Sequence, residues 1–146
     1  MKISLKCQYA IRGVLELARR HGRGTVSVSE IVKVYGISTR FLEVILNELK
    51  KGGFVGSKRG VQGGFFLAVH PRDVTVGDIV RFVDGPLDPV ACVVGRRRQT
   101  CPQRERCPLP EVWTQAREAV EQVYDSANFE DLVRRTKSAS TPNYSI

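Results

Sequence analysis

The sequence predicts a mostly α-helical fold with a small β-hairpin: a winged helix-turn-helix domain followed by a long C-terminal dimerisation helix. Three observations predict it. Apolar residues recur at helical spacing through the first half of the chain, two short helical segments flank a glycine, and a glycine-rich basic hairpin follows them. We expect the winged domain over residues 1–84, a cysteine-bearing loop over 85–108, the dimerisation helix region over 109–135 and a tail over 136–146.

The first two helices are recognised by their apolar spacing and their ends. The first is expected over about Leu5–His21, where the apolar positions are Tyr9, Ala10, Val14, Leu17 and Ala18. A second helix is expected to begin near Ser27 or Ser29, because Ser27 precedes Glu30 by the three residues of a capping box. It should stop at Gly36, since glycine readily ends a helix.

A third amphipathic helix follows after only a few residues. Ser38 offers a cap, and the helix is expected to end at Gly52 and Gly53. Its core positions are expected to be Phe41, Leu42, Ile45, Leu46 and Leu49. Two short helices separated by a turn that contains glycine are the signature of a helix-turn-helix.

Two short strands are expected next, over residues 54–59 and 65–69, joined by a glycine-rich turn over 60–64. A basic hairpin after a helix-turn-helix is typical of a winged helix. In such a domain the third helix enters the major groove, and the wing contacts phosphates or the minor groove.

The distribution of charge agrees with a nucleic-acid-binding face. Residues 1–74 carry thirteen Lys and Arg against five Asp and Glu, a net charge of +8, whereas the remaining residues are neutral overall. A basic excess of this kind attracts phosphates, although a solubilising surface would have the same composition.

The DNA-binding candidates fall into two groups. At the start of the third helix they are Ser38, Thr39, Arg40 and Glu43, and in the wing they are Lys58, Arg59, Gly60, Gly63 and Gly64. Arg40 can reach guanine and Glu43 can accept from the cytosine amino group. The alternatives are a helix-surface role for Glu43, pairing with Asn47 or Lys50, and a simple turn role for the wing glycines.

Two further helical stretches complete the pattern. Residues 74–84 read as a fourth helix capped by Thr75, with Asp78 three residues on, and another helix runs over about Leu109–Ala127. Its apolar stripe consists of Val112, Ala116, Ala119, Val120, Val123 and Ala127. Only the winged domain or a partner chain can cover this stripe, and a two-fold dimer would suit a pseudo-palindromic operator in double-stranded DNA.

The cysteines indicate a metal or redox centre. Cys92, Cys101 and Cys107 lie in one irregular, arginine-rich stretch, and the amphipathic N-terminus lacks the apolar run of a signal peptide or membrane span. We therefore expect a cytoplasmic protein with no membrane partner, in which clustered thiols bind metal or sense redox state. Three thiolates suit an iron–sulfur cluster and leave one ligand missing, while zinc or a thiol-only switch stays open.

An enzyme is not expected. The sequence contains no phosphate-binding GxxxxGK[ST], no GxSxG elbow, no HExxH helix and no CxxC redox motif.

The chain resembles the Rrf2 family of small winged-helix regulators over nearly its whole length. The matching residues are Met1–Ser4 with Tyr9 and Ala10, Ile37 and Ser38 with Phe41–Glu43, Arg59–Leu67, Val76–Ile79, the three loop cysteines and Trp113. The resemblance implies a homodimeric transcription regulator whose operator binding responds to an iron–sulfur cluster held by Cys92, Cys101 and Cys107. A [2Fe–2S] cluster, as in IscR-like members, is preferred over the [4Fe–4S] cluster of NsrR-like nitric-oxide or redox sensors.

Two departures from the family pattern concern the cluster loop. The interval of eight residues between Cys92 and Cys101 is longer than usual, and Pro110 stands where IscR-like members have a histidine ligand. Proline cannot bind a metal, so another donor, water or a small thiol must supply the fourth ligand. Cys7 is a candidate because it lies beside Gln8, which matches an acidic ligand position of NsrR-like members; its alternative role is a small apolar residue in the first helix.

Overall fold

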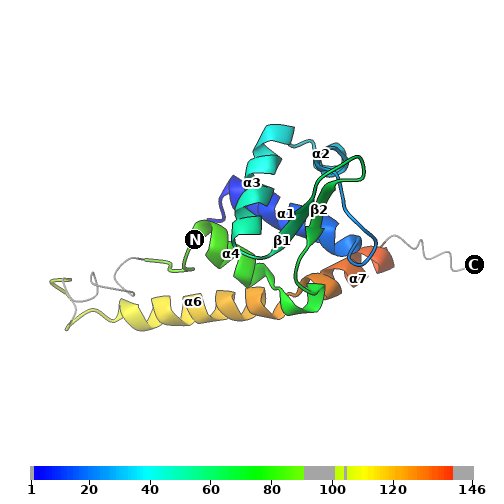
Figure 1. The fold of residues 1–146 in the computed structure, drawn as a ribbon. Coiled ribbons are helices and arrows are strands. Elements are labelled where there is room, and N and C mark those ends of the chain that lie inside the picture. The colour runs from blue at the N-terminus through cyan, green and yellow to red at the C-terminus, as the bar shows by residue number, and fades with distance from the viewer. Residues whose placement is uncertain (1, 91–100, 104, 140–146) are drawn as a thin grey trace, which may run out of the picture.

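The structure is a computed structural model that describes residues 2–90, 101–103 and 105–139. Figure 1 shows a winged domain built from the first part of the chain, with one long helix running along its lower side. The elements are α1 (Leu5–Arg19), α2 (Val28–Tyr35), α3 (Thr39–Lys51), β1 (Val55–Lys58), β2 (Gly64–Leu67), the 3-10 helix η1 (Pro71–Asp73), α4 (Val76–Asp84), α6 (Leu109–Ser126) and α7 (Phe129–Ala139). The predicted fold class is confirmed.

The helix ends follow the capping chemistry that the sequence predicts. The Ser27 side chain caps α2 by accepting from the backbone N–H of Glu30, whose carboxylate accepts from the Ser27 N–H. Gly36 ends α2 in the left-handed conformation, with φ of 63°. Thr75 and Asp78 form the same reciprocal pair at the start of α4. These caps fix where the helix-turn-helix and α4 begin.

The wing is a two-stranded antiparallel hairpin in which Val55 pairs with Leu67 and Lys58 with Gly64. Val26 extends the hairpin through a bridge to Phe65, with N–O distances of 2.8 and 2.9 Å. The segment before α2 is therefore hydrogen-bonded to the inner strand of the wing.

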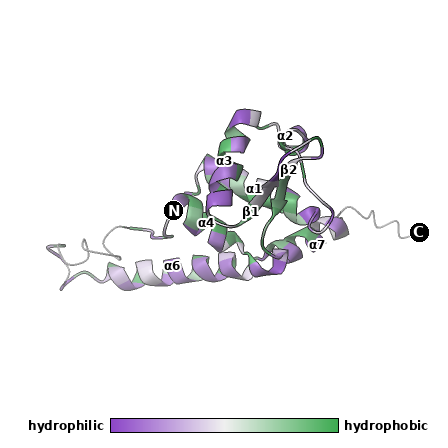
Figure 2. Ribbon diagram, in the orientation of Figure 1, coloured by the Kyte–Doolittle hydropathy of each residue, from purple (hydrophilic) through white to green (hydrophobic). Residues whose placement is uncertain are grey.

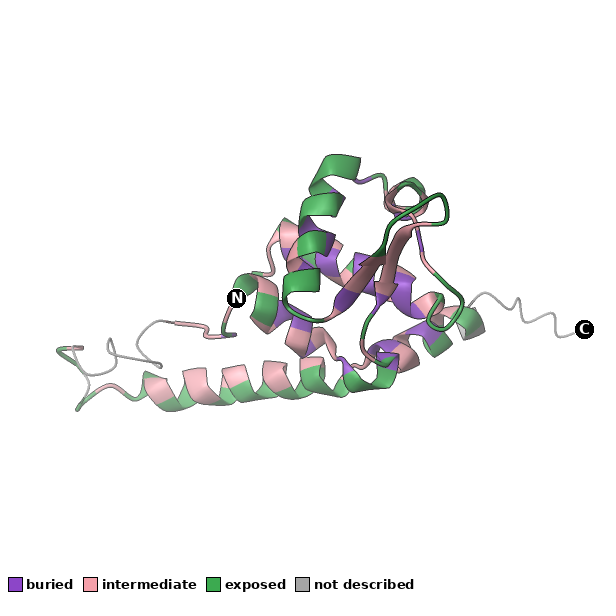
Figure 3. Cartoon of the chain, viewed as in Figure 1, coloured by how far each residue is buried: buried purple, intermediate pink, exposed green. Residues whose placement is uncertain are grey.

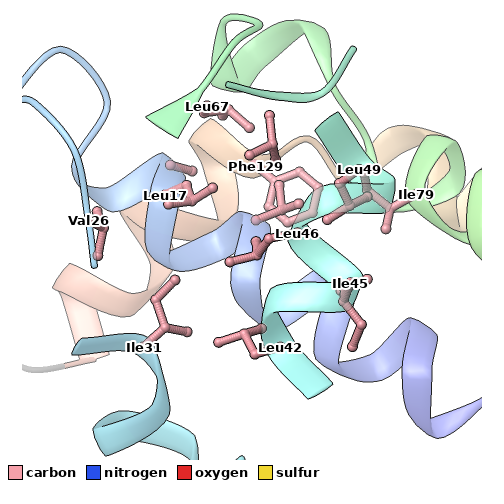
Figure 4. Packing of buried hydrophobic residues seen from close by; sticks show 14 of the residues in the cluster. Leu17, Val26, Ile31, Leu42, Ile45, Leu46, Leu49, Leu67, Ile79 and Phe129 are labelled. Carbon is pink, nitrogen blue, oxygen red and sulfur yellow. The ribbon is translucent and has the colours of Figure 1, made fainter. Parts of the chain in front are cut away.

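The core lies between α1, α3 and the hairpin, and α7 closes it (Figure 4). Leu17 of α1 and Leu46 of α3 are almost fully buried, as is Phe129 at the start of α7. The sequence patterns did not single out α7, which packs against α1. It continues to Ala139, so the boundary expected at residue 136 falls inside a helix.

One expected core residue lies at the surface. Phe41 is 37% exposed, and its ring meets Tyr9 edge-on with a centroid separation of 5.9 Å. The expectation of a buried Phe41 was wrong, because Leu42, Ile45, Leu46 and Leu49 suffice to fill the inner face of α3.

The long helix α6 is anchored near its C-terminal end. Asp125 accepts two hydrogen bonds from Arg81 of α4, at 2.6 and 3.3 Å. The other end of α6 extends past α4 in Figure 1. Only intermediate and exposed residues occur along the helix (Figure 3), and hydrophilic and hydrophobic residues alternate on it (Figure 2).

The apolar residues of α6 have different surroundings. Val120 and Tyr124 pack against a small buried cluster formed by Cys7, Val80 and Leu87. Leu109, Val112 and Val123 stay exposed. No helix within the described ranges is both long and apolar enough to cross a membrane.

Candidate nucleic-acid interface and cysteine loop

The start of α3 presents its predicted residues to solvent. Ser38, Thr39, Arg40 and Glu43 are all exposed. Ser38 occupies the N-cap position without a side-chain capping hydrogen bond, which leaves its hydroxyl to other partners. Glu43 and Lys50 form no salt bridge with each other, and Lys50 Nζ donates to Ser57 Oγ at 2.6 Å. Asn47 donates to the backbone carbonyl of Glu43, at 2.9 Å, and not to its carboxylate.

The wing residues lie on the same side of the molecule as the start of α3 (Figure 1). Lys58 and Arg59 are exposed, as is Gly60, whose φ is 110°. A Cβ on Gly63 would lie 2.6 Å from the Lys58 carbonyl oxygen, and one on Gly64 would lie 2.6 Å from that of Val26. The turn itself therefore requires these glycines, and their predicted contact with DNA stays a prediction.

A groove separates the wing from the loop that joins α1 to α2, a feature that sequence analysis missed. Its volume is about 610 Å³, and its walls include Arg23, Thr25 and Glu30 opposite Lys58 and Arg59. Thr25 Oγ1 donates to the Gln62 carbonyl across the groove, at 2.8 Å. The sequence shows Arg23 between Gly22 and Gly24. This pattern alone does not indicate that Arg23 lies beside the wing.

The cysteine loop lies at the start of α6. Cys101 and Cys107 are half-buried free thiols, separated by a turn in which the Arg106 N–H donates to the Gln103 carbonyl at 3.1 Å. Cys92 lies outside the described residues. The part of the chain that the structure describes contains no group of three or more His, Cys, Asp or Glu placed to hold a metal.

Cys7 has a different environment from the loop cysteines. Its side chain is fully buried against Val80 and Leu87. Burial raises the pKa of the Cys7 thiol to about 12, and the charge of Asp84 and a hydrogen bond to it act in the same direction. These surroundings favour a packed, protonated thiol over a metal-binding thiolate.

The first residues of the loop are attached to both α1 and α6. Asp84, the last residue of α4 before the loop begins, accepts from the Ser4 N–H at 2.8 Å and, with its other oxygen, from Ser4 Oγ at 2.5 Å. Leu87 is 5% exposed and packs in the Cys7 cluster. Asp88 lies 3.6 Å from Arg117 of α6. The start of the loop is therefore in contact with the start of the winged domain.

A family comparison agrees with this architecture. The sequence profile of the Rrf2 family, described as an iron-dependent transcriptional regulator, matches residues 3–135. The chain belongs to the Rrf2 family. The matched range spans the helix-turn-helix, the wing, the cysteine loop and α6. The chain is a DNA-binding transcription regulator, not an enzyme.

Individual relatives support the same conclusion. The transcriptional regulator CymR of Bacillus subtilis is 36% identical over 136 residues, which cover 93% of this chain and 92% of CymR. The structure of CymR, described as the global cysteine regulator, superimposes with a TM-score of 0.77 over 92% of this chain and 98% of that one. IscR of T. potens is 31% identical, with a TM-score of 0.76 over 98% of this chain and 93% of that one.

Proposed function

We propose that the protein is a homodimeric transcription regulator whose operator binding is modulated by an iron–sulfur cluster held by Cys92, Cys101 and Cys107. The observation that carries the proposal is the pair of free, half-buried thiols Cys101 and Cys107 at the start of α6, in a family described as iron-dependent. A [2Fe–2S] cluster is favoured by similarity to IscR.

The cysteine thiols of the loop are donors of the kind that bind an iron–sulfur cluster. Thiolates are the ligands that iron–sulfur clusters require, and the positive charges of the arginine-rich loop suit the negative charge of a thiolate-bound cluster. Pro110 supplies no donor. Cys7 is held in the core by its packing, and burial raises the pKa of its thiol, which keeps it protonated. Cys7 therefore remains a candidate fourth ligand only for a conformation in which the start of α1 moves; a small thiol or water fills the position otherwise.

DNA contacts are assigned to the two exposed groups at one end of the winged domain. Ser38, Thr39, Arg40 and Glu43 read bases in the major groove. The wing places Lys58, Arg59 and the glycine turn of Gly60, Gly63 and Gly64 against the DNA backbone. The exposure of the four α3 side chains supports this assignment.

The attachment of the loop suggests how its state affects DNA binding. Asp84 holds Ser4 at the start of α1, and Leu87 packs against Cys7 of the same helix. A change in the loop would shift α1 relative to α6 and so alter the spacing of the two α3 helices in a dimer. A coupling free energy of about 1–3 kcal/mol is typical of such regulation.

Iron and acid-labile sulfide content, measured together with the visible spectrum on protein purified without oxygen, tests the proposal. We expect about two irons and two sulfides per chain, lost in Cys101→Ala and in Cys107→Ala but retained in Cys7→Ala. About four of each would instead indicate a [4Fe–4S] centre of the nitric-oxide- or redox-sensing kind. Colourless protein after reconstitution would show the cluster assignment to be wrong.

The second candidate is a regulator switched by zinc or by thiol oxidation without a cluster. The similarity to CymR, the global cysteine regulator, favours it. Zinc bound to colourless protein, or operator binding that changes on mild thiol oxidation and returns on reduction, would support this candidate.

A further inference from the structure

The groove between the wing and the α1–α2 loop has two walls that are joined to each other. Thr25 Oγ1 donates to the Gln62 carbonyl, and the Val26 bridge to Phe65 ties the base of the loop to β2. Because of these bonds, the loop and the wing are expected to move together. The α1–α2 loop is therefore placed to contact the same partner as the wing.

The charges that face this groove are predominantly positive. Arg23 on the loop and Lys58 and Arg59 on the wing are exposed, and within the described ranges none of the three forms a salt bridge. Glu30 is the acidic residue of the groove, and its carboxylate already accepts from Arg20 at 2.9 Å and from the Ser27 N–H at 2.8 Å. The hydrogen bonds from Ser27 lower the pKa of Glu30, so the carboxylate stays ionised and satisfied within the protein.

The loop backbone holds Arg23 on a tight turn. The glycines on either side have positive φ values, 77° for Gly22 and 102° for Gly24. The Arg23 N–H donates to the Arg20 carbonyl at 2.9 Å, which closes the turn. The side chain therefore projects from a short, defined loop, and not from a flexible tail.

We propose that Arg23 is a further DNA-backbone contact: the groove receives a phosphate of the strand beside the wing, bound by Arg23 together with Lys58 and Arg59. Thr25 is a positioning residue that keeps the loop against the wing. The proposal rests on the DNA-facing orientation assigned to the wing under the proposed function. Arginine donors on two joined loops suit a phosphate because the guanidinium group binds its oxygens in bidentate geometry.

The test is the salt dependence of binding to a labelled random-sequence duplex of about 30 base pairs. Log K falls linearly with log salt, and each lost phosphate contact reduces the magnitude of this slope by about 0.9. We expect this loss per protomer in Arg23→Ala and an intermediate or wild-type slope in Arg23→Lys. Arg135→Ala removes the same charge from α7 and should leave the slope unchanged. An unchanged slope in Arg23→Ala would overturn the proposal.

Arg59→Ala separates failure of this proposal from failure of the wing assignment. If Arg59→Ala lowers the slope and Arg23→Ala does not, the wing binds DNA and Arg23 does not. If neither variant changes the slope, the wing does not face DNA, and the groove proposal fails with it. Circular dichroism and thermal unfolding of each variant establish that the fold is retained, which the exposure of both side chains leads us to expect.

The positioning role of Thr25 has its own readout. Thr25→Ser keeps a hydroxyl for the Gln62 carbonyl and should retain the wild-type slope. Thr25→Val removes the donor while keeping the shape of the side chain, and should lower affinity for the random duplex in the same direction as Arg23→Ala. In the background of Arg23→Ala, Thr25→Val should add little, because its effect acts through Arg23. Full additivity of the two changes would contradict the positioning role.

Discussion

At the scale of single residues, the three cysteines that the structure describes divide by environment. Cys7 is buried with a pKa raised to about 12, whereas Cys101 and Cys107 are half-buried at the start of α6. Only the thiolate reacts with alkylating agents, so a thiol pKa raised from 9.0 to about 12 lowers the reactive fraction of Cys7 at neutral pH roughly 1,000-fold. We predict that iodoacetamide modifies Cys101 and Cys107 of metal-free, reduced protein and spares Cys7, as mass spectrometry of the peptides would show.

Denatured protein serves as the control, since Cys7 should then react at the rate of the others. Rapid modification of Cys7 in folded protein would mean that the start of α1 opens, and would support Cys7 as a metal ligand.

The raised pKa of Cys7 also makes the stability of the fold depend on pH at high pH. Because the folded-state pKa is raised, the stability that protonated Cys7 contributes is complete below about pH 9 and is lost as the pH rises towards 12.

At the scale of elements, the contact between α4 and α6 depends on a glycine. A Cβ on Gly77 would overlap Asp125 Oδ1 and lie 3.0 Å from Arg81 Nη2, so an added methyl group would separate the pair that anchors α6. We predict that Gly77→Ala lowers the free energy of unfolding by about 1 kcal/mol relative to Gly13→Ala, measured by urea denaturation, because it disrupts the half-exposed Arg81–Asp125 ion pair. Gly13→Ala is the matched control in α1, where the nearest atom would be Leu46 Cδ2 at 3.4 Å.

The control should be neutral or stabilising, because alanine favours a helix over glycine by up to about 1 kcal/mol. Asp125→Ala should rescue much of the loss in Gly77→Ala, since it removes the overlapping carboxylate. Equal effects of the two glycine substitutions, or no rescue, would show that the close approach at Gly77 does not control the packing of α6.

Elements were predictable where their signals were local. The serine and threonine caps of α2 and α4 lie three residues from their partners, and the structure confirms both. The helix α7 was missed because its few apolar residues are outnumbered by charged ones. A local signal was nevertheless present: the Asn128 side chain accepts from the Asp131 N–H at 2.9 Å, the geometry of an N-cap.

At the scale of the whole molecule, sequence patterns could not supply contacts between distant segments. The bond between Ser4 and Asp84 spans 80 residues, and the one between Thr25 and Gln62 spans 37. Such contacts decide which surface the start of the cysteine loop touches and which residues share the groove beside the wing. Residue spacing predicted an apolar stripe on α6 that must pack against another surface. The structure was required to show that Val120 and Tyr124 pack against residues of the same chain.

The exposed remainder of that stripe leads to a prediction about assembly. Leu109, Val112 and Val123 are 47%, 52% and 63% exposed, on a helix whose end extends beyond the winged domain. If α6 forms the dimer interface, Val112→Glu buries an uncompensated carboxylate there, at a cost of about 3–5 kcal/mol. Dimerisation should then weaken at least about 100-fold, as sedimentation velocity would reveal. Gln122→Glu places the same residue on the polar face and should remain dimeric. If Val112→Glu remains dimeric, the dimer interface lies elsewhere than this face of α6. The proposed coupling, in which the loop changes the spacing of the α3 helices, would then also be wrong.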